Sequence, residues 1–365
     1  MTPRPASAVV PAPGRGTALN PANRFAPIRI EPAADYAELD EPGVPVERPH
    51  PRTQFYHDAS ESILVHHDSP DVGPGWGLNP YRGCEHGCAY CYARPFHDYL
   101  GWTSGLEFET KILVKLRAPD LLRAELSSPR WKPETVGFSG ITDVYQPAER
   151  HFKLTRACLQ VLAEFRQPAG IITKNFLVTR DLDLLQELAR WQCIAVCVSV
   201  TTLDADLAGR LEPRASRPEH RLRAIRMLAE AGIPVGVNVA PVIPGLTDHE
   251  LPAILEAAAA AGAKTAGYLI VRLPHAVQDV FLAWLDAHEP TKKERVLARL
   301  RALRGGRLND PRFGARMRGA GLFAGQIRRL FEVSARRAGL DPHAPARSLS
   351  TAHFRRPGGV QREML

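Results

Sequence analysis

The alternation of short apolar runs with longer amphipathic segments, which begins near residue 105, limits this chain to few folds. Five of the runs have the length and the β-branched content of buried strands. They are residues 135–140 (TVGFSG), 170–174 (GIITK), 194–200 (IAVCVSV), 234–240 (PVGVNVA) and 265–271 (TAGYLIV). Strands that alternate with helices pair in parallel. The sequence therefore predicts the α/β class.

The segments between these runs have the apolar period of helices. Residues 217–232 place Leu222, Ile225 and Leu228 on one face, as an amphipathic helix requires. Thr247 and Glu250 fit a capping box that would start the next helix. With one more strand leading into the cysteine-rich loop, the chain would have about six βα units. We expect a partial (βα)6 TIM-like barrel, with its chemistry at the carboxyl ends of the strands.

Two flanking segments differ from this core in composition. Ten of the 32 prolines lie in the first 50 residues, so residues 1–55 predict a proline-rich, mostly extended or disordered arm. Residues 291–365 hold 18 Lys and Arg against 5 Asp and Glu, whereas the rest of the chain holds 29 against 34. We therefore expect a barrel core at residues 56–290 and a basic helical C-terminal extension at residues 291–365.

The charge of this basic extension has two interpretations. It would attract a polyanion, such as nucleic acid, at low salt. It also fits a helical surface of solvated arginines without any such partner. Composition alone leaves both open.

Nothing in the sequence predicts a secreted or membrane-bound protein. No apolar run approaches the roughly 18 residues of a membrane span, and the N-terminus lacks the apolar core of a secretory signal. Six cysteines in such a chain favour metal ligands or redox groups in a reducing compartment over disulfides. We expect a cytoplasmic protein with no membrane partner.

Three of the six cysteines, Cys84, Cys88 and Cys91, are spaced C-x3-C-x2-C. Three thiolates on one loop can bind three irons of a [4Fe–4S] cluster and leave the fourth iron open to an outside ligand. Structural zinc would need a fourth ligand, such as His86 or His97. Crowded thiols without a metal would be prone to oxidation. The spacing favours an iron–sulfur site and keeps zinc as the alternative.

An aromatic residue, Tyr90, stands directly before the last of these cysteines. This pattern resembles the signature of the radical S-adenosylmethionine (SAM) superfamily. Three longer stretches resemble its spore photoproduct lyase-like branch and, within it, a bacterial subgroup. They are residues 79–94 (NPYRGCEHGCAYCYAR), 142–147 (TDVYQP) and 198–204 (VSVTTLD). The resemblance extends from about Gly14 to Leu340.

The resemblance implies an enzyme with two cofactors, a [4Fe–4S] cluster and SAM. In the superfamily, the methionine part of SAM chelates the open iron, and an electron from the cluster cleaves SAM. The resulting 5′-deoxyadenosyl radical takes a hydrogen atom from the substrate. Such an enzyme needs an electron donor, for example flavodoxin or ferredoxin. The resemblance also assigns Cys84, Cys88 and Cys91 to the cluster and Tyr90 to the cofactor site.

The resemblance places further SAM contacts at the strand ends. Thr142 and Asp143 follow the second strand, where the superfamily binds the methionine amino group, although the usual Gly-Gly-Glu motif is absent here. Lys174 ends the third strand and would pair with the SAM carboxylate. A lysine that caps a neighbouring helix is the alternative. Ser199 lies at a position that resembles a ribose or carboxylate contact.

Residues 241–245 (PVIPG) follow the fifth strand, where the superfamily packs backbone against adenine. Ile243 and Gly245 are the candidate contacts, because proline and glycine fix a loop that a flat ring can approach closely. A plain turn before the next helix would explain the same residues.

The strand at residues 194–200 allows one inference about the barrel interior. Its side chains alternate between an apolar face and a face that carries Cys197, Ser199 and Thr201. The apolar face should meet the helices, which turns Cys197 toward the lumen. The lyase branch returns a hydrogen atom to its product from a cysteine, so Cys197 is a candidate hydrogen donor. A small buried core thiol is the alternative.

Arg214 and Arg217, near Glu212, lie on a loop at the expected active end. They would bind an anionic substrate or the SAM carboxylate, or else form surface ion pairs of little energy. The substrate stays open between nucleic acid, a protein and a small metabolite. A zinc-stabilised binding module without catalysis is the alternative of another class.

Overall fold

Seven strands form one sheet in the part of the chain that the computed structural model describes, residues 14–21, 52–71, 75–341 and 349–357. The strand order is β10-β9-β8-β7-β6-β3-β2. The parallel strands are β3 (Gly75–Leu78), β6 (Val136–Phe138), β7 (Ala169–Thr173), β8 (Ile194–Ser199), β9 (Val235–Val242) and β10 (Thr265–Ile270). At the edge, β2 (Leu64–His67) is antiparallel to β3. The predicted α/β class and the partial barrel are confirmed.

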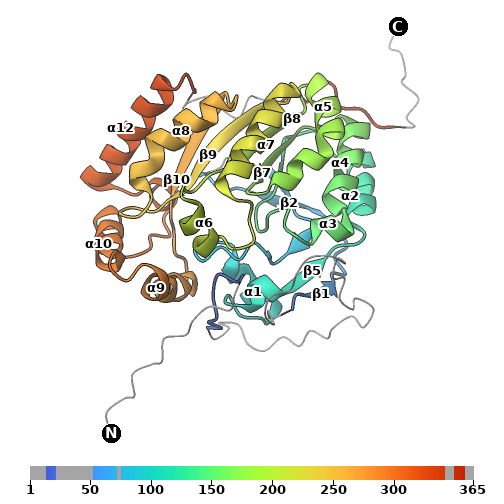
Figure 1. Ribbon diagram of the computed structural model, residues 1–365. Coiled ribbons are helices and arrows are strands. Elements are labelled where there is room, and N and C mark those ends of the chain that lie inside the picture. Colours follow the sequence, from blue (N-terminus) through green and yellow to red (C-terminus); the bar gives the residue numbers. More distant parts are fainter. Residues whose placement is uncertain (1–13, 22–51, 72–74, 342–348, 358–365) are drawn as a thin grey trace, which may run out of the picture.

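Helices cover the outer face of this sheet (Figure 1). They are α2 (Ala118–Ser127), α4 (Leu154–Phe165), α5 (Leu182–Arg190), α7 (Pro218–Glu230), α8 (Leu251–Ala260) and α12 (Gly321–Arg337). Val196 and Val198 of β8 share one buried core with Ile225 and Leu228 of α7. Each such side chain contributes about 1.5–3 kcal/mol when fully buried. These helices do not cover the inner face of the sheet or the carboxyl ends of its strands, which are therefore available for a functional site.

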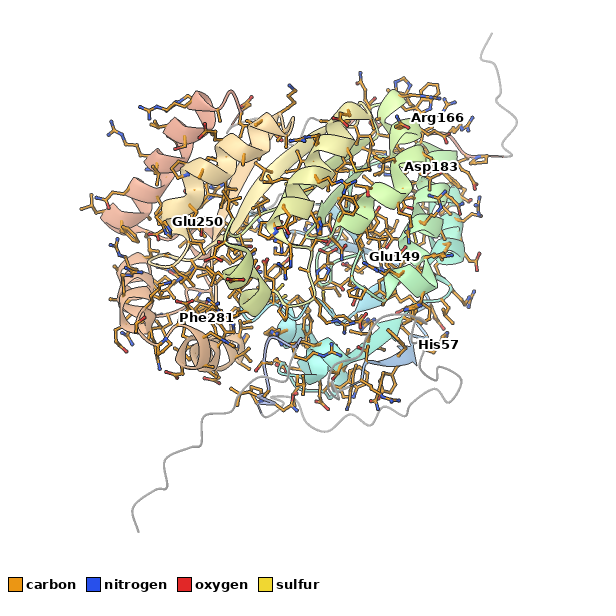
Figure 2. All side chains as sticks on the ribbon, viewed as in Figure 1. His57, Glu149, Arg166, Asp183, Glu250 and Phe281 are labelled. Atoms are coloured by element: carbon orange, nitrogen blue, oxygen red, sulfur yellow. The ribbon has the colours of Figure 1, made fainter. Side chains whose placement is uncertain are left out.

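The predicted capping box at the start of α8 is wrong. A 3-10 turn, η3 (Asp248–Glu250), precedes the helix, and the Thr247 hydroxyl accepts the N–H of Ile243 at 2.9 Å instead of capping it. The Glu250 carboxylate accepts the Thr202 hydroxyl at 2.6 Å and the N–H of Leu203 at 2.7 Å. Glu250, labelled in Figure 2, therefore joins α8 to the loop that follows β8, because these long-range donors take the place of the local cap.

A second, smaller sheet lies beside the main one and was not predicted from the sequence. Its strands are β1 (Gln54–His57), β5 (Lys111–Val114) and β4 (Tyr81–Arg82), in the order β1-β5-β4. Two short helical segments, η1 (Arg94–Leu100) and α1 (Glu107–Thr110), belong to the same region, which Figure 1 shows below the main sheet. Because β4 runs directly into the cysteine loop, this sheet fixes where the loop begins.

The basic extension is helical in its described part. It contains α10 (Lys293–Leu303) and α11 (Ala315–Arg318) as well as α12, and α9 (Val277–His288) precedes it. Because α12 packs against α8 and α10, it continues the outer layer of helices (Figure 1). Most of the expected N-terminal arm lies outside the described residues. None of the described helices is long and apolar enough to cross a membrane.

The imidazole of His97 should make stability depend on pH. His97 on η1 is buried and donates from Nε2 to the Lys111 carbonyl at 2.9 Å, and burial lowers its pKa from 6.5 to about 4. Between these values the unfolded chain binds the extra proton, so stability rises with pH in this window and is lost as the pH falls toward 4. We expect the free energy of unfolding in urea to fall by up to about 3 kcal/mol across the window.

The variant His97→Gln should lose this pH dependence. His57→Gln, at an exposed position on β1 labelled in Figure 2, is the control and should keep the slope of the wild type. Equal slopes in all three proteins would show that His97 does not titrate in this way.

Candidate active site

The three expected cluster ligands lie together at the end of β4. Cys84 and Cys88 are buried, and Cys91 is half-buried. Burial raises the pKa of all three thiols, and the charge of Cys91 adds to this for both Cys84 and Cys88. The N–H of Cys84 donates to the Phe108 carbonyl at 3.0 Å, which ties the loop to α1. Thiols that act on one another in this way share one small space, and they need a nearby cation to ionise.

A buried ion pair supports the backbone of this loop. Arg94 and Glu109 have fully buried side chains, and Arg94 Nη2 lies 2.5 Å from Glu109 Oε1. Arg94 also donates from Nε at 3.1 Å and from Nη2 at 2.8 Å to the carbonyl of Cys88. Removing one partner of such a pair typically costs about 3–5 kcal/mol. The position of Cys88 therefore depends on a charge pair that the sequence motif did not reveal.

The outer side of the cysteine loop is covered by a strap, residues 14–21, which the sequence had placed in the N-terminal arm. The N–H of Gly16 donates to Glu109 Oε2 at 3.0 Å, and the N–H of Leu106 donates to the Leu19 carbonyl at 2.9 Å. A Cβ atom at Gly16 would lie 1.6 Å from the carbonyl oxygen of Gly87. Only glycine allows this approach, so the strap and the loop fit each other at one position.

Of the two arginines near Glu212, only Arg214 is tied to the cysteine loop. Its Nη1 lies 2.9 Å from Glu85 Oε1, and Glu85 also accepts the Thr53 hydroxyl at 2.7 Å. Arg15 of the strap donates to the same hydroxyl at 3.1 Å. Arg217 is exposed at the start of α7. Arg214, in the loop after α6 (Ala205–Leu211), is therefore linked to the strap through Thr53, the residue before β1.

The aromatic residue before the last cysteine belongs to a buried polar cluster. The Tyr90 hydroxyl donates to Glu212, which also accepts the Thr201 hydroxyl at 2.7 Å. Burial alone would raise the pKa of Glu212, but the charges of Arg221 and Lys174 outweigh it and lower this pKa to about 2. Arg221, on α7, forms a buried ion pair with Glu212. Glu212 thus stays ionised and fixes Tyr90, with Arg221 as its main partner rather than Arg214 or Arg217.

Lys174 places a positive charge beside the thiols. Its Nζ lies 5.9 Å from the centre of the Tyr90 ring. Its charge counteracts the burial that raises the pKa of Cys88, Cys91 and Cys197. Within the described ranges, no carboxylate lies at ion-pair distance from Nζ, so the ammonium group is available to an outside anion.

Thr142 and Asp143 reach the cysteine loop, but their side chains are used within the protein. The Thr142 hydroxyl donates to the Gly83 carbonyl at 2.6 Å. Asp143 accepts the Thr173 hydroxyl at 2.8 Å and the N–H of Lys174 at 2.8 Å. These bonds join the loop after β6 to the cysteine loop and to the end of β7. Both residues therefore shape the site through the backbone they hold.

The other expected cofactor contacts lie farther along the same edge of the sheet. Ser199 is buried at the end of β8, and its carbonyl accepts Arg221 Nη1 at 3.2 Å. Ile243 is buried in the turn after β9. Gly245 has a φ of +82°, and a Cβ there would lie 3.3 Å from Cγ of Arg295 on α10. The turn therefore packs against α10 at Gly245.

The structure confirms the expected orientation of the side chains on β8. Val196 and Val198 are buried against the helices, whereas Cys197 is half-buried on the inner face. Its register partner on β7, Ile172, is 46% exposed, and nothing lies within 4 Å of a Cβ built at Gly170. Burial raises the pKa of Cys197 to about 12, so the thiol keeps its proton. The inner face is open near this thiol.

The two histidines considered for zinc are both engaged elsewhere. His86 Nε2 lies 3.0 Å from Asn175 Nδ2, and its Nδ1 lies 3.4 Å from Asp143. His97 donates from Nε2 to the Lys111 carbonyl. Among the residues described, no three His, Cys, Asp or Glu side chains are placed to share one metal ion. Three gathered thiols without a fourth ligand fit a cluster, in which each sulfur binds a different iron.

Comparison with known families agrees with this donor set. Residues 78–258 match the model of the Radical SAM superfamily. The chain contains a radical SAM domain. Domains of this superfamily use a [4Fe–4S] cluster together with SAM, and the matched residues include the whole cysteine loop, Lys174 and β8.

Relatives of the radical SAM domain occur in distant organisms. Uncharacterized protein Rv2578c of Mycobacterium tuberculosis is 38% identical over 215 residues, which are 58% of this chain and 63% of that protein. Uncharacterized protein MJ0683 of Methanocaldococcus jannaschii is 32% identical over 181 residues, 49% of this chain and 64% of that protein. The chain thus spans somewhat less than two thirds of the length of these relatives.

Among solved structures, spore photoproduct lyase has a similar fold. The lyase complexed with dinucleoside spore photoproduct has a TM-score of 0.58 at 15% identity, over 83% of this chain and 87% of that one. A tyrosine-to-phenylalanine mutant of the lyase gives a TM-score of 0.57, also at 15% identity and with the same coverage of both chains. At this identity the likeness describes the shared fold.

The contact between the strap and the cysteine loop should not tolerate a side chain. In Gly16→Ala, the new methyl group would overlap the Gly87 carbonyl, so we expect the strap to detach and the Gly16 bond to Glu109 to be lost. A hydrogen bond to a charged group contributes about 1.5–3 kcal/mol, so amide exchange in residues 14–21 should rise about tenfold or more. Hydrogen exchange with mass spectrometry measures this rate.

Gly325→Ala is the matched control, because Gly325 lies in α12 with nothing within 4 Å of an added Cβ. It should leave exchange in residues 14–21 unchanged. If Gly16→Ala behaves like this control, the strap does not depend on the close approach to Gly87.

Proposed function

We propose that this protein is a radical SAM enzyme that takes a hydrogen atom from a nucleic acid. The observation that carries the proposal is the gathering of Cys84, Cys88 and Cys91 on one loop beside Tyr90, over whose ring lies the ammonium group of Lys174, which pairs with no described carboxylate. They meet at the carboxyl ends of parallel strands, where such barrels hold their chemistry. When bound, the cluster and SAM supply a 5′-deoxyadenosyl radical.

The chain's own residues bind and orient these groups. The three thiolates are the cluster ligands, and the iron charge offsets the burial that raises their pKa. Lys174 binds the SAM carboxylate. The ammonium group of Lys174 is held in turn by a cation–π contact with the ring of Tyr90. The Glu212–Arg221 pair keeps Tyr90 in place.

The remaining contacts follow the same edge of the sheet. Thr142 and Asp143 position the loop that receives the methionine amino group, through the bonds they make to the cysteine loop and β7. Ser199 contacts the ribose of SAM, and Ile243 and Gly245 contact its adenine. Cys197, on the open inner face, is the proposed hydrogen donor. Unchanged products from Cys197→Ala would remove it from this role.

The charge of the extension supports a nucleic acid substrate. Twelve arginines of its described part have exposed side chains: Arg295, Arg299, Arg301, Arg307, Arg312, Arg318, Arg328, Arg329, Arg336, Arg337, Arg355 and Arg356. The lyase of similar fold was solved with a dinucleoside spore photoproduct. Arginines attract phosphates and stack on bases. We place the reaction in the cytoplasm, with flavodoxin or ferredoxin as the electron donor.

A protein or a small metabolite is the second candidate substrate. The open inner face beside Ile172 would accept either one. A zinc-stabilised module is not supported, because both candidate histidines are already engaged and the domain is of the radical SAM superfamily.

Replacing the three proposed ligands should abolish cofactor loading. After anaerobic reconstitution with iron and sulfide, the wild type should be brown and should release 5′-deoxyadenosine on reduction with SAM. The triple variant Cys84→Ala/Cys88→Ala/Cys91→Ala should hold no cluster and form no 5′-deoxyadenosine. Iron and sulfide analysis and chromatography of the nucleoside measure both effects.

Cys193→Ala is the control, because Cys193 lies before β8 and its Sγ donates to the Arg166 carbonyl at 3.2 Å, away from the loop. It should keep the wild-type iron content. A triple variant that still holds four irons would contradict the ligand assignment. Transfer of deuterium from labelled candidate substrates into 5′-deoxyadenosine would then identify the substrate class.

Binding of single-stranded DNA should weaken steeply with salt. Each phosphate contact contributes about −0.7 to the slope of log affinity against log salt. Arg328→Gln/Arg329→Gln on α12 should make this slope shallower by about 1.4, since two contacts are removed. The control Arg190→Gln/Arg226→Gln removes two exposed arginines outside the extension and should keep the slope. A wild-type affinity that does not respond to salt would argue for a protein or a metabolite.

A further inference from the structure

Arg272 presents an unused positive charge at the mouth of the barrel. It follows β10 by two residues, and its side chain is half-buried. Its guanidinium carbon lies 4.3 Å from the centre of the Tyr92 ring. Within the described ranges, the guanidinium group makes no hydrogen bond and no ion pair. A partly desolvated arginine without an acceptor is costly, and a bound anion would relieve this cost.

The ring beneath Arg272 is held firmly. Tyr92 directly follows Cys91, and its hydroxyl donates to the Gly140 carbonyl at 2.6 Å. Tyr92 thus spans from the cysteine loop to the loop after β6, and its face sets the position of Arg272. The guanidinium group is therefore both placed and free to bind.

The carboxylate whose charge acts on Arg272 is already paired with another arginine. Asp71, in the segment after β2, pairs with Arg316 Nε and accepts the N–H of Gly314 at 2.6 Å. Arg316 also donates to the Ser69 hydroxyl at 2.9 Å. Burial lowers the pKa of Arg272, and the charge of Arg316 lowers it further, against the opposing effects of Tyr92 and Asp71. Two guanidinium groups thus lie near one carboxylate, which pairs with Arg316 alone, and the surplus charge is positive.

The Arg316–Asp71 pair also keeps this charge at the mouth. The segment from residue 307 to 319 starts near β10, at one edge of the main sheet, and Arg316 reaches the segment after β2, at the other edge. Arg272 therefore lies where the two edges are joined. It faces the loops at the carboxyl ends of the strands, where a substrate must enter.

Arg272 and Lys174 follow different strands of the main sheet. Lys174 follows β7 and Arg272 follows β10, which lies three strands away in the sheet. Strands are spaced about 4.8 Å apart, so the two strand ends are separated by roughly 14 Å. The two cations therefore start from separate strand ends, and the SAM affinity of each variant shows which of them the SAM carboxylate contacts.

We propose that Arg272 binds a phosphate group of the substrate, with Tyr92 as its positioning residue. This inference rests on the proposed function and adds a specific contact to it. The planar guanidinium group can donate two parallel hydrogen bonds to phosphate oxygens. One exposed arginine of the extension, Arg318, lies near this point, since its guanidinium carbon is 4.0 Å from the ring of Tyr268 on β10, and it would offer a neighbouring phosphate a second contact. The phosphate would fix which nucleotide faces the inner sheet beside Cys197.

The test compares Arg272→Gln with Arg166→Gln in the reconstituted, SAM-loaded protein. Arg166 is the matched control, since its guanidinium carbon lies 3.5 Å from the Trp191 ring, at the far end of the molecule (Figure 2). The probes are a thymidine tetranucleotide and, separately, inorganic phosphate. Arg272→Gln should weaken binding of the tetranucleotide about tenfold or more. Arg272→Lys should weaken tetranucleotide binding less, because the positive charge is kept while the two parallel donors of the guanidinium group are lost.

A second readout separates this site from the cofactor site. Arg272→Gln should keep wild-type SAM affinity, whereas Lys174→Gln should lose it. If Arg272→Gln weakens SAM binding as Lys174→Gln does, Arg272 belongs to the cofactor and the inference is overturned. It is also overturned if Arg272→Gln binds both probes as Arg166→Gln does, or if the wild type binds neither probe. Thermal melting confirms that each variant is folded.

The outcomes also separate this inference from the proposed function. If the wild type loads no cluster and cleaves no SAM, the proposed function fails. If the wild type does both, and Arg272→Gln and Arg166→Gln bind the probes equally, only the Arg272 assignment fails.

Discussion

The burial of three thiols on one short loop is the constraint on which the rest of this structure depends. Such a loop has little core of its own, and its sulfurs ionise only if a cation lies near. Two buried ion pairs, Arg94–Glu109 and Arg221–Glu212, hold it in place. The first supports the backbone at Cys88, and the second fixes Tyr90 through Glu212. Both pairs are costly to break, so they hold the loop and Tyr90 in place.

The inner face of the main sheet stays open beside this loop. This inner face carries small residues such as Gly170, which is in register with Ala195 of β8, so the helices bury one side while the other stays open. Apolar burial, which stabilises the fold, is therefore concentrated between the sheet and its outer layer of helices. The edge of the sheet then needs only a few side chains, such as Lys174, to carry charge toward the site.

The sequence was enough to predict what depends on local pattern. The five strands, their parallel pairing and the convergence of the cysteines follow from periodicity and from a short motif. The partners of Arg94 and Arg221 do not, because each depends on how distant segments meet. Residues 14–21 looked like part of a proline-rich arm, since one hydrogen bond from Gly16 to a carboxylate 93 positions away leaves no trace in composition. Thr247 fitted a helix cap in the sequence, yet its hydroxyl accepts a hydrogen bond from the nearby backbone N–H of Ile243.

The arrangement of ion pairs around the cysteines has a consequence for biosynthesis. A ribosome releases the strap, the loop and Glu109 early, whereas Arg221 emerges more than a hundred residues later. Domains generally fold from the N-terminus as they are made. Until α7 has been translated, Glu212 lacks its counter-ion and Tyr90 has no fixed position. The loop therefore gains its second buried ion pair, and with it the fixed Tyr90, only after more than half of the printed sequence has been made.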